Sequence, residues 1–221
     1  IEMKVIKFGG KSLANGEGLN KVLEIISAKY KEEKKLVVVV SARGNTTNQL
    51  ETILDKAKAK KDFRNAFEIF KKEQLLPYYT LDLEEDFSRL FEIFRGVKYL
   101  GDYSTKIKDE VLAQGELISA KVVTRLLAKN GIKASFVDSR QLIKTDDNFG
   151  NALTLDKETE KCIQNYFNAQ NEDTIQVVTG FIAANLKGET TTLGRNGSNY
   201  TASLLANYLN ADEFQNYTHV D

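Results

Sequence analysis

The feature that most constrains the fold is a run of five consecutive apolar residues, Leu36–Val40, of which four are valine. A strand that is apolar on both faces must be covered on both, which is typical of the parallel sheets of α/β proteins. An earlier run, Met3–Phe8, ends at Gly9-Gly10 and predicts a second strand. Between the two runs, apolar residues recur at helical spacing, so the opening predicts a strand–helix–strand unit. These helical positions are Leu19, Val22, Leu23, Ile25 and Ile26.

From about residue 46 to residue 129 the pattern is almost wholly helical, and the only proline, Pro77, lies between two helical stretches. Phenylalanines form stripes here, and we interpret them as core packing because their spacing is that of a buried helix face. Strands are then predicted over 133–137, 174–182, 190–193 and 213–220, and helices over 155–168 and 200–209. The simplest architecture is one layered α/β domain with a helical insertion at about 46–129.

Composition excludes several classes of function. The chain has 31 basic and 31 acidic residues, so no net charge attracts nucleic acid or an anionic membrane. A single cysteine, Cys162, excludes a disulfide framework, and a single histidine, His219, excludes a multi-histidine metal site. No apolar run approaches the roughly 18 residues of a membrane span, and no secretory signal precedes the first strand. We expect a cytoplasmic protein and assign no metal-ligating residue.

The first candidate site is the segment Lys7–Ser12, Lys-Phe-Gly-Gly-Lys-Ser. It ends like a Walker A loop, but Val5 stands where that motif needs glycine, so the segment is not a P-loop. A strand followed by two glycines can still direct backbone N–H groups at an anion, and Lys7 and Lys11 add positive charge. The alternative is a plain tight turn.

Three further segments carry polar groups at predicted strand ends or inside a helix. Residues 41–48 form a hydroxyl-rich loop after the valine run, where open α/β sheets place ligands. Gly115-Glu116 interrupts a helical pattern, and residues 191–199 form a glycine loop that opens a helix, a natural anion site. The alternatives are helix caps for the two loops and a solvated glutamate for Glu116. Taken together, the four segments hold the groups that phosphoryl transfer needs.

In this order, the motifs resemble the aspartate kinase family. Residues 7–12 resemble its opening Lys-Phe-Gly-Gly-Thr-Ser, and residues 191–202 resemble its Thr-Thr-Leu-Gly-Arg-Gly-Gly-Ser-Asp-Tyr-Thr-Ala. Gly115-Glu116, the 41–48 loop and Thr179–Ile182 also fit, so the resemblance covers nearly the whole chain. It implies a three-layer α/β/α amino-acid-kinase fold, of the carbamate-kinase type, around a mostly parallel sheet.

The resemblance also implies a reaction. The γ-phosphoryl group of MgATP moves to the side-chain carboxylate of L-aspartate and gives 4-phospho-L-aspartate, at the start of lysine, threonine and methionine synthesis. ATP and Mg²⁺ are the implied cofactors. Two alternatives stay open: another amino-acid kinase that acts on acetylglutamate or glutamate, and a non-catalytic binding or regulatory module that keeps the fold.

Residue roles follow from the matched motifs. Lys7 is expected to neutralise the transferring phosphoryl group, with N–H groups from Gly9 and Gly10. Glu116 is expected to hold the ammonium group of aspartate and Arg195 its α-carboxylate. The acceptor pocket is completed by Ser41, Thr47 and Ser198, and the phosphate and ATP side by Ser12, Thr218 and His219.

Three positions depart from the family pattern. Lys11 replaces a threonine, His219 replaces an aspartate, and Asn199 replaces the aspartate that helps to organise the phosphoryl-transfer site. We still assign Asn199 a catalytic position. Its side-chain carbonyl is expected to orient the neighbouring Lys7 or a water molecule, without the negative charge of an aspartate.

The resemblance also bears on the limits of the chain. It places an acceptor lobe first and a nucleotide lobe from near residue 174 that continues beyond Asp221. Met3 is the only methionine, and we expect it to be the native start. Regulatory ACT domains normally follow and would support a homo-oligomer, and in some members a homoserine dehydrogenase is fused after them. The variant Arg195–Ser198 is associated with such bifunctional proteins. We therefore expect a catalytic domain with an incomplete nucleotide lobe, which alone binds aspartate poorly and does not turn over ATP.

Overall fold

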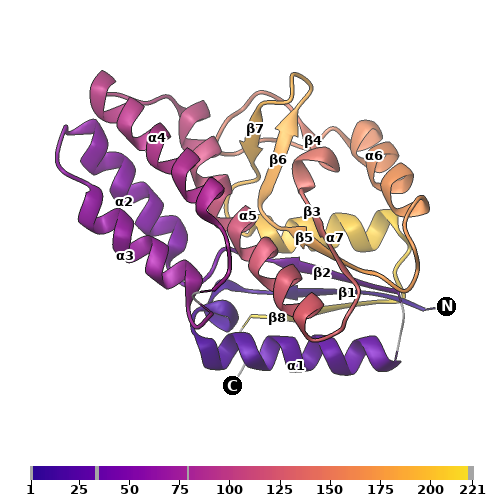
Figure 1. The fold of residues 1–221 in the computed structure, drawn as a ribbon. Helices are drawn as coiled ribbons and strands as arrows, with labels where there is room; N and C mark the ends of the chain where they lie inside the picture. Colours follow the sequence, from indigo (N-terminus) through magenta and orange to yellow (C-terminus); the bar gives the residue numbers. More distant parts are fainter. Residues whose placement is uncertain (1, 33–34, 79, 219–221) are drawn as a thin grey trace.

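The computed structural model describes residues 2–32, 35–78 and 80–218, and its centre is a five-stranded parallel sheet with the order β3-β5-β2-β1-β8. The valine run forms the middle strand β2, which pairs with β1 and β5 (Figure 1). The prediction of a mostly parallel sheet is confirmed. The strands are β1 (Met3–Phe8), β2 (Lys35–Val40), β3 (Ala134–Val137), β5 (Ile175–Thr179) and β8 (Glu213–Tyr217).

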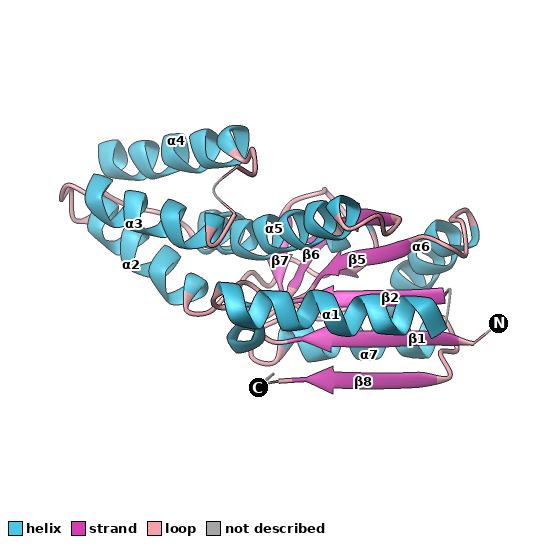
Figure 2. Ribbon diagram, turned by 60° about the horizontal axis from the view of Figure 1, so that its bottom comes forward, coloured by secondary structure: helices cyan, strands magenta, loops and turns pink. Residues whose placement is uncertain are grey.

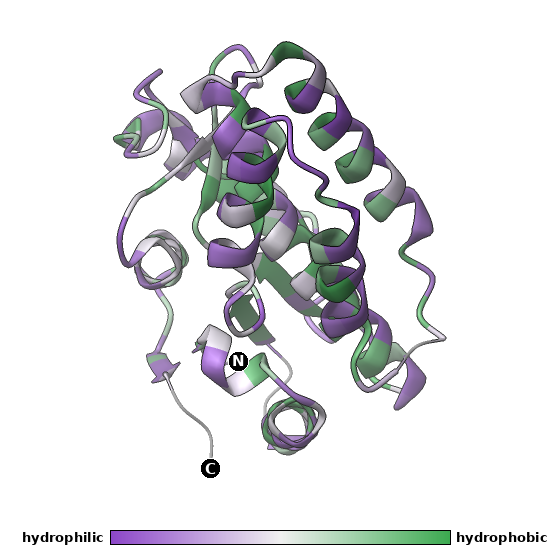
Figure 3. Cartoon of the chain, turned by 90° about the vertical axis from the view of Figure 1, so that its left-hand side faces the viewer, coloured by the Kyte–Doolittle hydropathy of each residue, from purple (hydrophilic) through white to green (hydrophobic). Residues whose placement is uncertain are grey.

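Helices cover both faces of this sheet. Leu36, Val38 and Val40 face a large core that includes α1 (Gly16–Glu32) and α5 (Thr105–Lys129). Val37 and Val39 face a second core with α6 (Asp156–Asn168) and α7 (Gly197–Tyr208). Because side chains alternate along a strand, a run that is apolar at every position needs both layers. Figure 2 shows α1 and α7 on opposite sides of the strands, and Figure 3 shows the hydrophobic strands between the helices.

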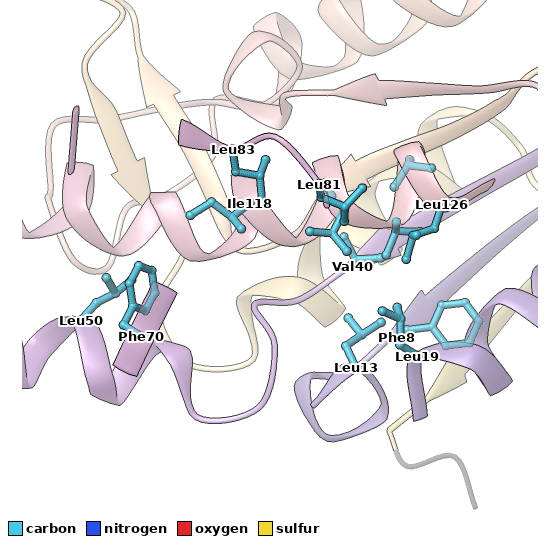
Figure 4. Packing of buried hydrophobic residues seen from close by; sticks show 14 of the residues in the cluster. Phe8, Leu13, Leu19, Val40, Leu50, Phe70, Leu81, Leu83, Ile118 and Leu126 are labelled. Atoms are coloured by element: carbon cyan, nitrogen blue, oxygen red, sulfur yellow. The ribbon is translucent and has the colours of Figure 1, made fainter. Parts of the chain in front are cut away.

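Three helices extend beyond the carboxyl ends of the strands (Figure 2): α2 (Thr46–Lys58), α3 (Arg64–Leu75) and α4 (Glu84–Leu100). Their phenylalanines pack on one another, as in the pair Phe67 and Phe91, whose ring centroids are 5.2 Å apart. The interpretation of these stripes as core is confirmed, and Pro77 lies between α3 and α4 as expected. Figure 4 shows Phe8, Leu13 and Leu19 in the same large core. None of the described helices is long and apolar enough to cross a membrane.

The prediction of one strand over 174–182 is wrong. The chain forms β5 in the large sheet and then β6 (Ile182–Asn185) in a second sheet of order β4-β6-β7, with β4 at Lys144–Thr145 and β7 at Thr190–Thr192. Phe181 separates the two strands with φ 71°, a left-handed conformation that no continuous strand contains. The last helix begins at Gly197 rather than at 200. The last strand ends at Tyr217, and residues 219 and 220 of its predicted span lie outside the described residues.

Candidate active site

A cavity of about 340 Å³ lies at the carboxyl ends of β1 and β2 and at the start of α7. This is the edge at which open α/β sheets bind ligands. All four segments selected from the sequence contribute to it, although they span most of the chain. The lining residues are Lys7, Gly10, Ser41, Ala42, Gly44, Thr47, Glu116, Phe181, Gly194, Asn196, Gly197, Ser198 and Asn199.

Lys7 brings a positive charge to this cavity from the strand β1. Its side chain is buried, with 7% of the residue exposed, and burial lowers its pKa. Within the described part of the chain, no hydrogen bond or ion pair holds its Nζ. A buried ammonium group without a partner is costly, so an anionic ligand at this position would be stabilising.

Glu116 brings a buried carboxylate from α5. Its Oε1 accepts a hydrogen bond of 3.2 Å from the backbone N–H of Ala42, whereas no residue in the described part of the chain hydrogen-bonds Oε2. Burial raises its pKa to about 8. The neighbouring Gly115 permits this approach, since a Cβ there would lie 3.0 Å from the Ala42 Cβ. The alternative of a solvated glutamate is therefore wrong.

The loops after β1 and β2 form one continuous wall of the cavity. The Gly44 N–H donates to the Gly10 carbonyl at 2.8 Å, and the Ser41 N–H donates to the Phe8 carbonyl at 3.2 Å. A Cβ on Gly10 would lie 2.7 Å from the Ala42 carbonyl oxygen, so the close contact of these loops needs glycine. The cap position of α2 is Asn45, with no side-chain capping bond, so the alternative that Thr46, Thr47 or Asn48 caps this helix is wrong.

The opposite wall is the turn from β7 into α7. Gly194 and Asn196 both adopt left-handed backbone conformations, with φ of 79° and 60°. Ser198 lies against Gly180, where a Cβ would come within 2.4 Å of its Oγ. The cap position of α7 is Asn196, without a side-chain bond, so neither Ser198 nor Asn199 is the cap. Instead, the Asn199 Oδ1 accepts a 3.2 Å hydrogen bond from the Asn216 side chain.

Arg195 is the one predicted acceptor-side residue that the structure leaves outside the cavity lining. It is exposed, and it has no hydrogen bond or ion pair within the residues described. Its neighbours Gly194 and Asn196 both line the cavity, so the Arg195 side chain extends from the edge of the cavity. The structure brings Lys7, Thr47, Glu116 and Ser198 together in this one cavity.

Of the residues predicted to bind phosphate and ATP, Lys7 and Gly10 line the cavity, whereas Gly9, Ser12 and Thr218 do not. The Gly9 N–H donates to the Tyr217 carbonyl at 2.9 Å, so its expected role as a free donor to phosphate is wrong. Ser12 is fully buried and outside the cavity lining. Thr218 is exposed, and its carbonyl oxygen lies 3.2 Å from where a Cβ on Gly9 would stand. The prediction for His219 falls outside the described residues.

Sequence reasoning missed two buried charged residues, Asp109 and Arg43, which lie outside the cavity lining. Asp109 accepts three hydrogen bonds, from the Gly150 N–H and from the N–H and hydroxyl of Thr192, and so fixes β7 to α5. Among the described residues, the Arg43 side chain donates only to backbone carbonyls. In the sequence, Arg43 follows soon after an apolar run, and Asp109 lies within an amphipathic helical pattern. Neither position indicates which groups the side chain hydrogen-bonds.

A second hollow of about 400 Å³ lies near the amino ends of β1 and β2. Its lining is rich in amide side chains, and its charges Lys35 and Glu172 pair with each other at 2.8 Å. The cavity with Lys7 and Glu116 therefore offers the stronger polar site. Among the residues described, no three carboxylate, histidine or cysteine side chains gather as ligands for a metal ion.

Comparisons with known proteins show which family the whole chain is similar to. The family model described as the amino acid kinase family matches residues 2–221. The aspartokinase of Rickettsia prowazekii is 30% identical over 216 residues, covering 97% of this chain and 39% of that protein. The lysine-sensitive aspartokinase 3 of Escherichia coli is 30% identical over 225 residues, covering 99% and 49%.

A solved structure is also similar over nearly the whole chain. E. coli aspartokinase III in complex with aspartate and ADP superposes with a TM-score of 0.88 at 26% identity, covering 99% of this chain and 49% of that one. The chain thus spans half or less of the length of the relatives it matches.

Proposed function

This chain belongs to the amino acid kinase family, and we propose that it is the catalytic part of an aspartate kinase. It would transfer the γ-phosphoryl group of MgATP to the side-chain carboxylate of L-aspartate. The observation that carries the proposal is the buried Glu116, in the same cavity as Lys7. Among the described residues, neither Glu116 Oε2 nor Lys7 Nζ has a hydrogen-bond partner. The similarity to aspartokinases, one of them solved with aspartate and ADP, supports it.

Recognition of the acceptor would use the two charged ends of the amino acid. The ammonium group of aspartate would pair with Glu116 Oε2, replacing an unfavourable buried charge with an ion pair. Arg195 would bind the α-carboxylate from the rim, because a guanidinium group binds a carboxylate through two parallel hydrogen bonds. The hydroxyl groups of Ser41, Thr47 and Ser198 would line the remaining pocket.

Transfer would then be an in-line displacement. A side-chain carboxylate oxygen of aspartate attacks the γ-phosphorus, and the new O–P bond forms as the bond to the bridging oxygen breaks and its electron pair leaves with ADP. Lys7 would neutralise the transferring group, with the Gly10 N–H as a donor and Asn199 orienting the groups around it. Mg²⁺ would arrive with the nucleotide, because it is usually bound through substrate phosphates.

We propose that the chain is organised in two lobes. The acceptor lobe would comprise residues before about 174, including the helical segment 46–129, and the nucleotide lobe would begin near 174, with Thr218 and His219 toward ATP. Arg195 and Ser198 would reach the acceptor from the nucleotide lobe. For the whole protein, we propose a homo-oligomer formed through regions outside this chain.

The proposal predicts a defined substrate preference. The full-length protein should release ADP with aspartate and much less with glutamate or N-acetylglutamate, because Glu116 needs an unblocked ammonium group at a fixed distance. A coupled ADP assay measures this, and Glu116→Gln, which keeps the size of the side chain, is the matched control. Preference for the N-acetylated substrate would favour an acetylglutamate kinase, and no ADP release with any acceptor would favour a non-catalytic module.

A further inference from the structure

Arg43 lies in the wall formed by the loop after β2, but its side chain takes no part in the cavity lining. Only 3% of the residue is exposed. Its Nε donates to the Leu13 carbonyl at 2.7 Å, Nη1 to the Gln74 carbonyl at 2.7 Å and Nη2 to the Leu76 carbonyl at 2.6 Å. Nη1 also lies 3.4 Å from the Glu73 carbonyl. Within the described ranges, no carboxylate pairs with this guanidinium group.

These carbonyls belong to two segments that are far apart in the sequence. Leu13 ends the 3-10 turn η1 (Gly10–Leu13), which follows β1. Glu73, Gln74 and Leu76 lie at the end of α3. The last carbonyls of a helix have no partner within the helix, and a positive charge is favourable there. Arg43 thus joins the β1 turn, the β2 loop and the end of α3 at one point.

We infer that Arg43 is a positioning residue for aspartate: its guanidinium group fixes the loop that presents the Ala42 N–H to Glu116 and carries Ser41 and Thr47. This inference rests on the proposed function, from which it takes aspartate as the substrate. Arg43 touches neither cavity nor ligand and acts through its neighbours in the chain.

The backbone on both sides of Arg43 carries its effect to the cavity. The preceding residue, Ala42, donates to Glu116 Oε1, and the following residue, Gly44, donates to the Gly10 carbonyl. A second tie runs through Thr46, whose Oγ1 donates to the Arg43 carbonyl and accepts a 2.7 Å bond from the Gln74 side chain. Loss of the guanidinium group would leave buried carbonyls unpaired and free this loop to move away from Glu116.

A lysine cannot replace this arginine. The three nitrogen atoms of the guanidinium group lie in one plane and reach carbonyls in three directions, whereas an ammonium group is a single point charge on a flexible chain. Arg43→Lys should therefore keep the charge and lose part of the geometry. Arg43→Ala should lose both and leave a space shaped for a guanidinium ion.

The test compares Arg43→Ala and Arg43→Lys with Ile163→Ala, a cavity variant in the other hydrophobic core, all in the full-length protein. Arg43→Ala should lower kcat/KM for aspartate by about 10- to 100-fold, mainly through KM, with a smaller change in KM for ATP. The kcat/KM of Arg43→Lys for aspartate should lie between the values of Arg43→Ala and the wild type. Millimolar guanidinium chloride, but not sodium chloride, should restore part of the loss in Arg43→Ala and none in Ile163→Ala.

The inference is overturned if Arg43→Ala keeps the wild-type KM for aspartate, or if Ile163→Ala raises that KM equally. A second readout needs no substrate: the pKa of Glu116, followed by NMR, should be higher in Arg43→Lys, because the Ala42 N–H that lowers it is less well held. An unchanged Glu116 pKa in a folded Arg43→Lys would also contradict the inference. A wild-type protein inactive toward aspartate would instead contradict the proposed function, and the NMR comparison would then decide the role of Arg43.

Discussion

Helix α5 carries two buried carboxylates that face different surroundings. Asp109 and Glu116 are seven residues apart, about two helical turns, and both are almost fully buried. Asp109 receives three hydrogen bonds, which use both of its oxygens. Glu116 receives one, and its second oxygen receives none from the residues that the structure describes. Neither forms an ion pair within the described residues, and burial raises the pKa of both.

The difference separates a structural role from a binding role. A buried carboxylate whose oxygens are all hydrogen-bonded stabilises the elements that it joins, here α5, β7 and the turn at Gly150. A buried carboxylate with an oxygen that lacks a hydrogen-bond partner, beside a cavity, is unfavourable until a cation binds to it. Groups whose pKa values are strongly perturbed in this way are concentrated at functional sites. Each prediction below tests one side of this contrast.

The largest expected effect is on stability at Asp109. Asp109→Ala leaves two backbone N–H groups and one hydroxyl without an acceptor, so the free energy of unfolding should fall by about 3 kcal/mol or more. Asp109→Asn, which keeps one acceptor oxygen, should lose less. Urea unfolding followed by circular dichroism measures both. A variant Asp109→Ala as stable as the wild type would show that this carboxylate does not hold β7.

Next comes substrate binding at Glu116. Glu116→Gln should raise KM for aspartate by about 10- to 150-fold, the equivalent of a charge-assisted contact of roughly 1.5–3 kcal/mol, with a smaller change in KM for ATP. Unlike Asp109→Ala, it should not destabilise the fold at neutral pH, because a carboxyl group with a pKa of about 8 is mostly protonated there and the neutral amide has the same size. Steady-state kinetics with each substrate varied in turn measures the effect. An equal rise in both KM values would argue against the assigned contact.

The same carboxylate should make the protein sensitive to pH. Its pKa of about 8 in the folded state exceeds the ordinary value, so the folded state binds an extra proton between the two values. Stability from this group is therefore greatest at acidic pH, declines as pH rises toward about 8, and then levels off. Affinity for aspartate should change in the opposite direction, rising about tenfold per pH unit below 8. Glu116→Gln should flatten both profiles, and profiles unchanged by that substitution would assign the titration to another group.

The smallest effect is expected at Asn199, away from α5. Its side-chain oxygen accepts from Asn216, and an aspartate would keep that acceptor. Asn199→Asp should therefore change stability by less than about 0.5 kcal/mol and turnover only modestly. If the wild-type protein is inactive and Asn199→Asp restores turnover, the asparagine is a loss of function and the non-catalytic alternative gains support.

The sequence predicted the parts of the molecule that depend on local pattern. The valine run of β2 required two covering layers, and the glycine segments at 9–10, 115 and 194–197 marked places where chain segments approach closely. The aromatic stripes of α3 and α4 followed from helical spacing alone.

The remainder depends on contacts that no local pattern contains. Phe181 breaks the expected strand because β6 pairs with β7 in another sheet. Gly9 lost its expected role because β8, more than two hundred residues later, takes its N–H. Arg43 and Asp109 were missed because their partners are backbone groups brought close only by the fold.

The central claim is that Glu116 binds the ammonium group of the substrate. The most direct test measures the affinity of the wild-type protein and of Glu116→Gln for aspartate and for succinate, which has both carboxylates but no ammonium group. The wild type should prefer aspartate by about 10- to 150-fold, and Glu116→Gln should lose most of this preference while binding succinate as well as the wild type does. An undiminished preference for aspartate in Glu116→Gln would contradict the claim.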